Sequence, residues 1–531
     1  MPQLDEPVHA NKPIFRGEVF RPLSSLLMGM FVTILSGTVI STSLPVIVSE
    51  LGGGQDAFNW IVISALLATT VSMPVWGKLA DLLDRKMLNQ LCLLLFVVGS
   101  VIGGLAQDTA TLIAARFIQG IGAGGHVGLS QVIIADLLSP RERGRYMGIF
   151  AAVMALGTIG GPLLGGVITD TVGWRWNFLV TIPIALATIA MLQFTLRLPE
   201  RPHRRMRIDY FGIVFLTSGV SLLLVWVSLA GSQFAFYSLT SAWMLGGSLV
   251  LLTLTVLTEL RVSEPIIPLS LFKDRTFVLS VLASIPTGMT MFGTAIFLSQ
   301  YMQLARGASP TQSGIMTLPM VAGMLLSTTI IGSLISRTGR WKRYVVGGAI
   351  AQTVGLVLIG NIRFDTNFVL VSVCMFVLGA GVGALMQNLV LIVQNTVKAV
   401  NLGVASAGIA FFRSLGGTLG VSAMGALLGA RAGALIEASA SRLQEAFAGL
   451  GAEGASAAEA LLAGTLPQLA QLPQSVRAVI ESVYGRAVAD TFLAAAPLAL
   501  IAVVAVVLLP NAGLSQDTGV ERSVAEAAAQ D

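Results

Sequence analysis

The feature that most constrains this chain is a series of long apolar segments that recur along nearly its whole length. Each has about 20 residues or more, which is enough for a helix to cross the hydrocarbon core of a bilayer. Only 11% of the 531 residues are charged, whereas roughly 25% is usual for a soluble domain. The chain is therefore predicted to be an all-α, multi-pass membrane protein.

We expect fourteen transmembrane helices. The first 22 residues are too polar for a signal peptide, and no small-residue cleavage site follows the first apolar segment, so we expect that segment to remain as a helix of the mature protein. The expected segments are 23–48, 57–80, 88–106, 110–135, 146–169, 177–196, 210–230, 241–260, 277–302, 311–335, 344–361, 368–394, 403–428 and 491–509.

The distribution of basic residues orients these helices. Loops after even-numbered helices hold eighteen Lys and Arg residues, whereas the short loops after odd-numbered helices hold three. Because basic loops stay in the cytoplasm, both termini are predicted to be cytoplasmic. We expect the protein in the plasma membrane, as in a bacterial inner membrane.

Related motifs occur in the two halves of the sequence. GKLADLLDRK (77–86) follows helix 2, and GSLISRTGRWKR (332–343) echoes it after the tenth segment, with Gly332 standing 255 positions after Gly77. The same offset relates Gly161 to Gly416. Internal repeats of this kind are typical of secondary transporters, whose substrate site lies between the two halves.

These motifs resemble those of the major facilitator superfamily, in its fourteen-helix drug:proton antiporter branch. The resemblance rests on GKLADLLDRK (77–86), AARFIQGIGAGG (114–125), GTIGGPLLGG (157–166) and RSLGGTLG (413–420), in this order and spacing. It departs from the family at Asp84, where glycine is usual. It implies a major facilitator fold with two six-helix bundles, helices 1–6 and 9–14, and helices 7 and 8 inserted between them.

The resulting organisation has seven parts. They are a cytoplasmic tail (1–22), an N-terminal bundle (23–200), the inserted pair (201–264), five helices of the C-terminal bundle (265–428), a long extracytoplasmic loop (429–490), the last helix (491–510) and a cytoplasmic tail (511–531). In the long loop, apolar residues recur at helical spacing around a Gly/Ala-rich middle. This predicts two amphipathic helices that rest on the membrane or cap the protein, with a flexible insertion as the alternative.

The motif after helix 2 suggests a latch. Gly77, Asp81 and Arg85, with Arg340 in the second half, stand at cytoplasmic helix ends. A carboxylate and a guanidinium there can form an ion pair with the other bundle in one state of the transporter. An ordinary cluster of topogenic charges is the alternative interpretation.

The glycines of helix 5 predict close helix packing. Gly157, Gly161 and Gly165 share a face, and Pro162 removes a backbone hydrogen bond. Static packing explains this pattern as well as a rocking motion does. The family resemblance makes these residues, together with Gly166, an antiporter motif.

Helix 4 carries Arg116, Gln119 and His126 on one face. At 1.5 Å per residue, His126 lies roughly 15 Å beyond Arg116. Ionisable residues inside a membrane are costly and suggest function, although a structural role in a polar core is the alternative. Since His126 is the only histidine within a predicted span, we hypothesise that proton coupling runs through it and that Arg116 tunes it.

The substrate cavity is predicted from polar and aromatic residues of the central helices. The resembled family typically has an aspartate where Ser36 stands and an asparagine where Ser41 stands, so the usual acid of helix 1 is absent. This puts recognition of cationic drugs in doubt. The candidate lining residues are Ser36, Ser41, Gln119, Phe292, Gln387, Asn388, Phe412 and Arg413.

The sequence thus predicts a monomeric secondary transporter that exports amphiphilic small molecules by alternating access, with protons as the coupling ion. An exporter or flippase of a lipid-like metabolite in contact with membrane lipids is an alternative, and a non-transporting sensor or scaffold is a third. The sequence has no nucleotide-binding loop, metal cluster or nucleophile–base pair. We therefore expect no enzymatic activity, cofactor, metal or nucleic-acid partner.

Overall fold

The computed structural model describes residues 17–51, 55–197, 209–230, 234–235, 237–262, 265–266, 268–308, 310–398, 401–441, 474–511 and 513–515. These residues are almost entirely helical, and the β structure among them is one isolated bridge between Ala230 and Phe234. The helices of the first half are α1 (Gly17–Glu50), α2 (Gln55–Leu82), α3 (Arg85–Leu105), α4 (Thr109–Leu137), α5 (Pro140–Thr171), α6 (Trp176–Leu179), α7 (Thr181–Thr195), α8 (Tyr210–Leu229) and α9 (Leu239–Glu259).

The second half begins with a 3₁₀ helix, η1 (Leu269–Lys273). The helices that follow are α10 (Arg275–Leu304), α11 (Pro310–Met316), α12 (Leu318–Thr338), α13 (Lys342–Ile359), α14 (Phe368–Met386), α15 (Asn388–Thr396), α16 (Leu402–Ala438) and α19 (Gln474–Leu508).

Short polar residues set many of the helix limits. The side chains of Asp84 and Asp108 accept hydrogen bonds from backbone N–H groups in the first turns of α3 and α4. Ser139 and Glu142 form a capping box at the start of α5, where Pro140 occupies the first turn. Gly339 ends α12 with a φ of 67°, a left-handed conformation that favours glycine.

The described residues contain 13 helical segments that are long and apolar enough to cross a membrane. Three of these join a short helix to a longer one: α6 with α7, α11 with α12, and α14 with α15. Helix α5 is not among the 13, but its 32 residues pack along both α1 and α12. Because α5 crosses the protein with the others, the helix count agrees with the fourteen spans predicted.

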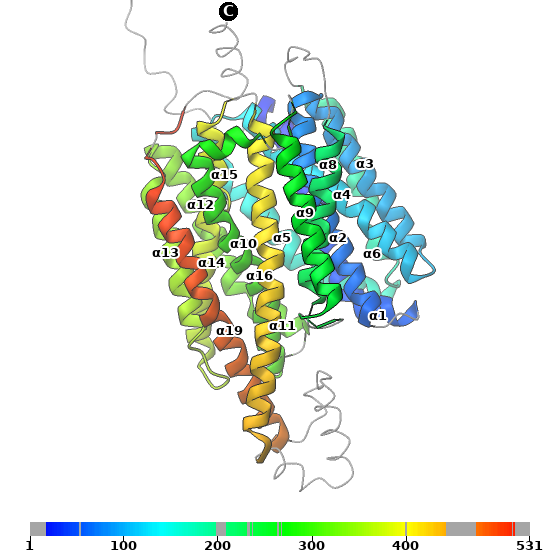
Figure 1. Ribbon diagram of the computed structural model, residues 1–531, viewed down its shortest axis with the longest axis vertical. Helices are drawn as coiled ribbons and strands as arrows, with labels where there is room; N and C mark the ends of the chain where they lie inside the picture. The colour runs from blue at the N-terminus through cyan, green and yellow to red at the C-terminus, as the bar shows by residue number, and fades with distance from the viewer. Residues whose placement is uncertain are drawn as a thin grey trace, which may run out of the picture.

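The helices form two bundles with an inserted pair. Helices α1–α7 make the first bundle, and α10–α16 with α19 make the second (Figure 1). Between the bundles, α2 packs against α16 and α5 packs against α12. The inserted helices α8 and α9 pack on each other, and a hydrophobic cluster joins α8 to α2 and α16 at the seam between the bundles.

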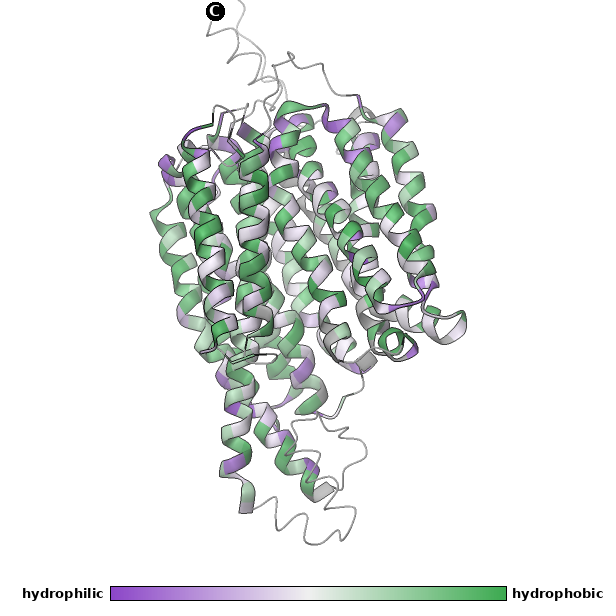
Figure 2. Cartoon of the chain, turned by 45° about the vertical axis from the view of Figure 1, so that its right-hand side comes forward, coloured by the Kyte–Doolittle hydropathy of each residue, from purple (hydrophilic) through white to green (hydrophobic). Residues whose placement is uncertain are grey.

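Two helices extend well beyond the rest. Helix α16 has 37 residues, so at 1.5 Å per residue it is about 55 Å long, whereas a bilayer core is about 30 Å thick. Together α16 and α19 project from the end of the bundles where α16 ends (Figure 1). Hydrophilic residues gather at both ends of the bundles and on this projection (Figure 2).

The projection shortens the loop predicted for 429–490. Residues 429–438 continue α16 and residues 474–490 belong to α19, so the described ends of this loop are extensions of transmembrane helices. The apolar residues Val476, Ile480 and Val483 are buried, because α19 packs against α10, α13 and α16. Residues 442–473 lie outside the described part of the chain.

Candidate functional site

The two bundles are joined at the end where α2 finishes, which we call the Asp81 end. The Asp81 carboxylate accepts hydrogen bonds from the backbone N–H groups of Gly403 (2.9 Å) and Val404 (3.0 Å) in the first turn of α16. A helix N-terminus carries unpaired N–H groups and a partial positive charge, so it binds a carboxylate well. Gly77 lets α2 approach closely, because a Cβ there would collide with the Ala407 side chain and make a tight contact with the backbone oxygen of Gly403.

The contact of the Asp81 carboxylate with Gly403 and Val404, which we call the Asp81 latch, differs in chemistry from the predicted ion pair between bundles. Arg85 pairs within the first bundle, with Asp136 at 2.5 Å and with Asp81 at 3.1 Å. It therefore holds the Asp81 carboxylate in place while α16 supplies N–H groups from the other bundle. Arg340 is exposed after the end of α12, and the contacts of the latch do not include it.

Further hydrogen bonds join the bundles between the Asp81 end and the middle of the helices. Thr70 of α2 and Ser414 of α16 share one at 2.7 Å. Gln394 of α15 donates to the backbone carbonyl of Gln131 in α4 at 3.4 Å. These pairs were not predicted, although polar residues within apolar segments are the signal that could have found them.

The glycines of α5 face α1. A Cβ at Gly157 would meet Ile34, one at Gly161 would collide with Thr38, and one at Gly165 would collide with the backbone of Val39. Thr38 also donates a 3.0 Å hydrogen bond to the carbonyl of Gly157. Gly166 has open space where a Cβ would be, so close packing explains three of the four glycines. The side chain of Pro162 lies outside the described residues.

A polar network lies inside the first bundle. Arg116 donates to the Gln119 side chain at 2.6 Å. The Gln119 amide nitrogen donates to Ser36 of α1 at 3.1 Å and to Ser100 of α3 at 2.9 Å. Ser36 and Gln119 are thus in contact, and the hydrogen bonds of Gln119 tie α4 to α1 and α3 within one bundle. The side chain of Ser41 lies outside the described residues.

His126 is fully buried in the same bundle. Its Nδ1 lies 2.5 Å from the side-chain oxygen of Asn89 in α3. Its Nε2 has no hydrogen-bond partner and lies against Gly29 of α1, where a Cβ would collide with the ring. The imidazole therefore occupies a tight pocket formed by α1, α3 and α4, and the absence of a Cβ at residue 29 makes that pocket.

The structure does not bring His126 and Arg116 together. Between the two positions α1, α3 and α4 contribute Val32, Phe96 and Ala123 to one hydrophobic cluster. On each of these helices the cluster residue stands between a residue of the Arg116 network and a residue beside His126. An apolar layer therefore separates the two polar groups.

The candidate residues of the second bundle gather around a break in a helix at Gln387, between α14 and α15. Arg413 of α16 donates to the Met386 carbonyl at 3.0 Å, and Asn388 donates to the Ala384 carbonyl at 2.7 Å. The Gln387 amide lies 3.9 Å from the Sδ of Met154 in α5, so it reaches the first bundle. Phe292 packs against Gly417.

Phe412 has a different environment. Its ring packs edge-on against Phe411 (centroid distance 5.1 Å) and Phe272 (6.2 Å). Phe411 belongs to the cluster at the seam with α8, and Phe412 lies against that cluster. Phe412 thus contributes to packing between α16, η1 and the inserted pair.

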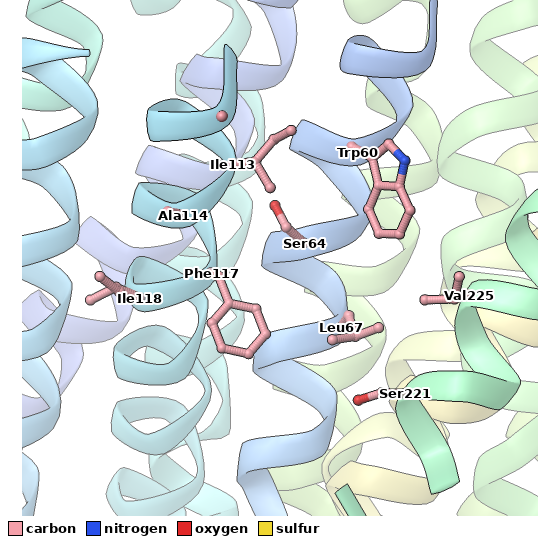
Figure 3. Close-up of a pocket in the computed structure, with 10 residues that line it drawn as sticks. Trp60, Ser64, Leu67, Ile113, Ala114, Phe117, Ile118, Ser221 and Val225 are labelled. Atoms are coloured by element: carbon pink, nitrogen blue, oxygen red, sulfur yellow. The ribbon is translucent and has the colours of Figure 1, made fainter. Parts of the chain in front are cut away.

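An apolar groove of about 580 Å³ lies outside the first bundle, between α2, α4 and α8 (Figure 3). Trp60 and Leu67 of α2, Phe117 of α4 and Val225 of α8 line it, and Ser64 and Ser221 add two hydroxyl groups. None of the predicted cavity residues lines this groove.

Comparison with known proteins agrees with this architecture. The family model described as Major Facilitator Superfamily matches residues 26–421. The chain belongs to this superfamily. It is a multi-pass membrane transporter and not an enzyme, and the all-helical fold with two bundles confirms the predicted fold class.

Relatives in the superfamily include proteins named for multidrug transport and multidrug resistance. An uncharacterized MFS-type transporter of Mycobacterium tuberculosis is 36% identical over 503 residues, covering 95% of this chain and 71% of the relative. The multidrug transporter protein MdtP of Bacillus subtilis is 31% identical, covering 78% of this chain and 76% of the relative. Multidrug resistance protein 3 of the same species is also 31% identical, with coverage of 82% and 83%.

Solved structures share the fold at low sequence identity. The human organic anion transporter MFSD10 aligns with a TM-score of 0.58 at 16% identity, covering 92% of this chain and 99% of that structure. The proton:xylose symporter XylE aligns with a TM-score of 0.61 at 13% identity, covering 96% of this chain and 99% of that structure.

Proposed function

We propose that this protein is a secondary active transporter that exports amphiphilic small molecules from the cytoplasm by alternating access of its two bundles. The observation that carries the proposal is the Asp81 latch, in which a carboxylate of one bundle binds the N-terminus of a helix in the other. A contact of this kind adds a modest stabilisation when formed and is lost as a unit when the bundles separate, which suits a two-state element. The relatives named multidrug transporters support the substrate class.

The basic loops indicate which side of the membrane the closed end of the protein faces. Arg85, Lys86 and the basic loop 337–343 all lie at the Asp81 end, which by the positive-inside rule is the cytoplasmic side of the plasma membrane. The described conformation is then closed toward the cytoplasm. We propose that opening at this side breaks the latch, and that substrate then enters between the bundles.

Proton coupling through His126 is the second part of this proposal. Histidine is the side chain that most readily changes charge near neutral pH, and His126 is the only histidine among the described residues. Its contacts with Asn89 and Gly29 place it where three helices of the first bundle meet. A gain of charge there would disturb this packing and favour a rearranged bundle. Because an apolar layer separates Arg116 from His126, an influence of Arg116 would act through the helices rather than by contact.

Transport in proteoliposomes tests the proposal. Purified protein should accumulate an amphiphilic probe against its gradient when a proton gradient is imposed. His126→Gln retains a polar side chain but cannot titrate, so it should abolish accumulation while sparing downhill exchange of the probe. Ser130→Ala, which removes a buried hydroxyl one turn along α4, is the matched control. Accumulation by His126→Gln at the wild-type rate would show that His126 is structural.

A lipid or lipid-like substrate is the second candidate, and the groove between α2, α4 and α8 favours it. The groove is lined almost entirely by apolar side chains and belongs to helices that span the membrane, so an acyl chain could lie in it. Lipid that co-purifies with the protein and moves between leaflets in proteoliposomes would support this candidate. Movement of soluble amphiphiles alone would exclude it.

A further inference from the structure

The acidic residues that the structure describes near the spans are already engaged at helix ends. Asp81 binds α16, and Asp136 pairs with Arg85. Asp490 pairs with Arg431 on the projection of α16 and α19. Asp108, Asp209 and Asp274 cap helix N-termini, and Glu259 accepts from the backbone N–H of Ile266.

Two arginines within the spans are not paired with these acids. Arg116 is only 8% exposed, and its described hydrogen bond goes to the neutral side chain of Gln119. The Arg116 Nε has no hydrogen-bond partner. Arg413, in the first third of α16, donates to a single backbone carbonyl, that of Met386. Within the described part of the chain, neither guanidinium has a carboxylate within ion-pair distance.

An uncompensated charge inside a membrane protein is unfavourable, because the low dielectric removes its hydration and no counter-ion replaces it. A guanidinium has five N–H donors, so Arg116 can bind more than the one acceptor it has. A bound anion would supply both the opposite charge and the missing acceptors. A purely structural arginine would be expected to have its donors satisfied by the protein itself.

We propose that the substrates of this transporter are anionic amphiphiles, such as molecules with a carboxylate or sulfonate on an apolar body, and that Arg116 binds the anionic group. Arg413 adds positive charge in the second bundle and favours the same class. This inference rests on the proposed transport function and specifies its substrate. A permanent cation would lose its hydration without gaining a counter-charge from the described spans.

Direct binding to the purified protein in nanodiscs tests the substrate class without requiring transport. Radiolabelled taurocholate, an anionic amphiphile, should bind, and tetraphenylphosphonium should bind at least about tenfold more weakly. Arg116→Gln should weaken taurocholate binding by about tenfold or more, and Arg116→Lys should restore part of it, because the charge remains. Arg363→Gln removes the same charge from an exposed loop and should leave binding unchanged.

The outcomes separate this inference from the proposed function. Equal or tighter binding of tetraphenylphosphonium, or unchanged taurocholate binding in folded Arg116→Gln and Arg413→Gln variants, would overturn the inference. Thermal unfolding of each variant shows whether it is folded, and Arg116→Lys provides a second reading if Arg116→Gln is not. Taurocholate binding without flux in proteoliposomes would support the anion site but contradict the transport function. Flux of cations alone would support the transport function but contradict the anion site.

Discussion

At the scale of single residues, the latch depends on the charge of Asp81. Its two carboxylate oxygens each accept one N–H group of α16, and Arg85 lies beside it. Asp81→Asn removes the charge and one of the two acceptors. The lost interaction with the helix N-terminus should cost only about 1 kcal/mol, so insertion and folding should persist.

We expect Asp81→Asn to reduce transport strongly, because the closed state would lose the contact that defines it. The measurement is probe flux in proteoliposomes at matched protein content. Asp84→Asn is the matched control: Asp84 caps α3 through Met87 N–H, and asparagine caps a helix equally well. Wild-type flux in Asp81→Asn would refute the role of the latch.

A substitution at Ser36 tests the same charge argument by adding a negative charge to the first bundle instead of removing a positive one. It accepts a hydrogen bond from Gln119, which in turn binds Arg116. Ser36→Asp would place a carboxylate in this network and offer Arg116 a permanent partner. We expect the variant to bind taurocholate more weakly and tetraphenylphosphonium more tightly than the wild type, as measured by the same nanodisc assay. No change in the ratio of the two affinities would contradict this reasoning.

At the scale of helices, the contact between α5 and α1 depends on particular glycines. A Cβ at Gly165 would collide with the backbone of Val39, which cannot move aside as a side chain can, whereas a Cβ at Gly166 would meet open space. Overpacking of this kind typically costs about 1–3 kcal/mol.

The neighbouring substitutions Gly165→Ala and Gly166→Ala therefore form a matched pair. Gly165→Ala should lower the unfolding temperature and the flux, and Gly166→Ala should change neither. Thermal unfolding followed by tryptophan fluorescence, together with flux in proteoliposomes, measures both effects. Equal behaviour of the two variants would show that the glycine face does not set this helix contact.

Helix α5 also illustrates what a sequence can predict. Its apolar run predicted a span over 146–169, and the structure extends that helix at both ends, to Pro140–Thr171. The extensions of α16 and α19 were harder to predict. Apolar periodicity identified helices there but could not show that they continue the spans, because a helix and its continuation share one pattern.

At the scale of the whole molecule, the fourteen helices and their two halves could be predicted, because hydropathy and a repeated motif are properties of the chain itself. The partners across the bundles could not. Asp81 binds backbone N–H groups of Gly403 and Val404, and backbone groups leave no signature in a sequence. The separation of His126 from Arg116 likewise depends on an apolar layer assembled from three helices.

The central claim is that the Asp81 latch closes one of two interconverting states, and the distance between the bundles at that end tests it most directly. Spin labels at Met87→Cys and Lys398→Cys would report this distance by double electron–electron resonance, since both positions are exposed and lie in different bundles. The buried Cys92 and Cys374 would be replaced by alanine. We expect mainly a short distance in the wild type and a large population at a longer distance in Asp81→Asn. Identical distance distributions in the two proteins would contradict the account.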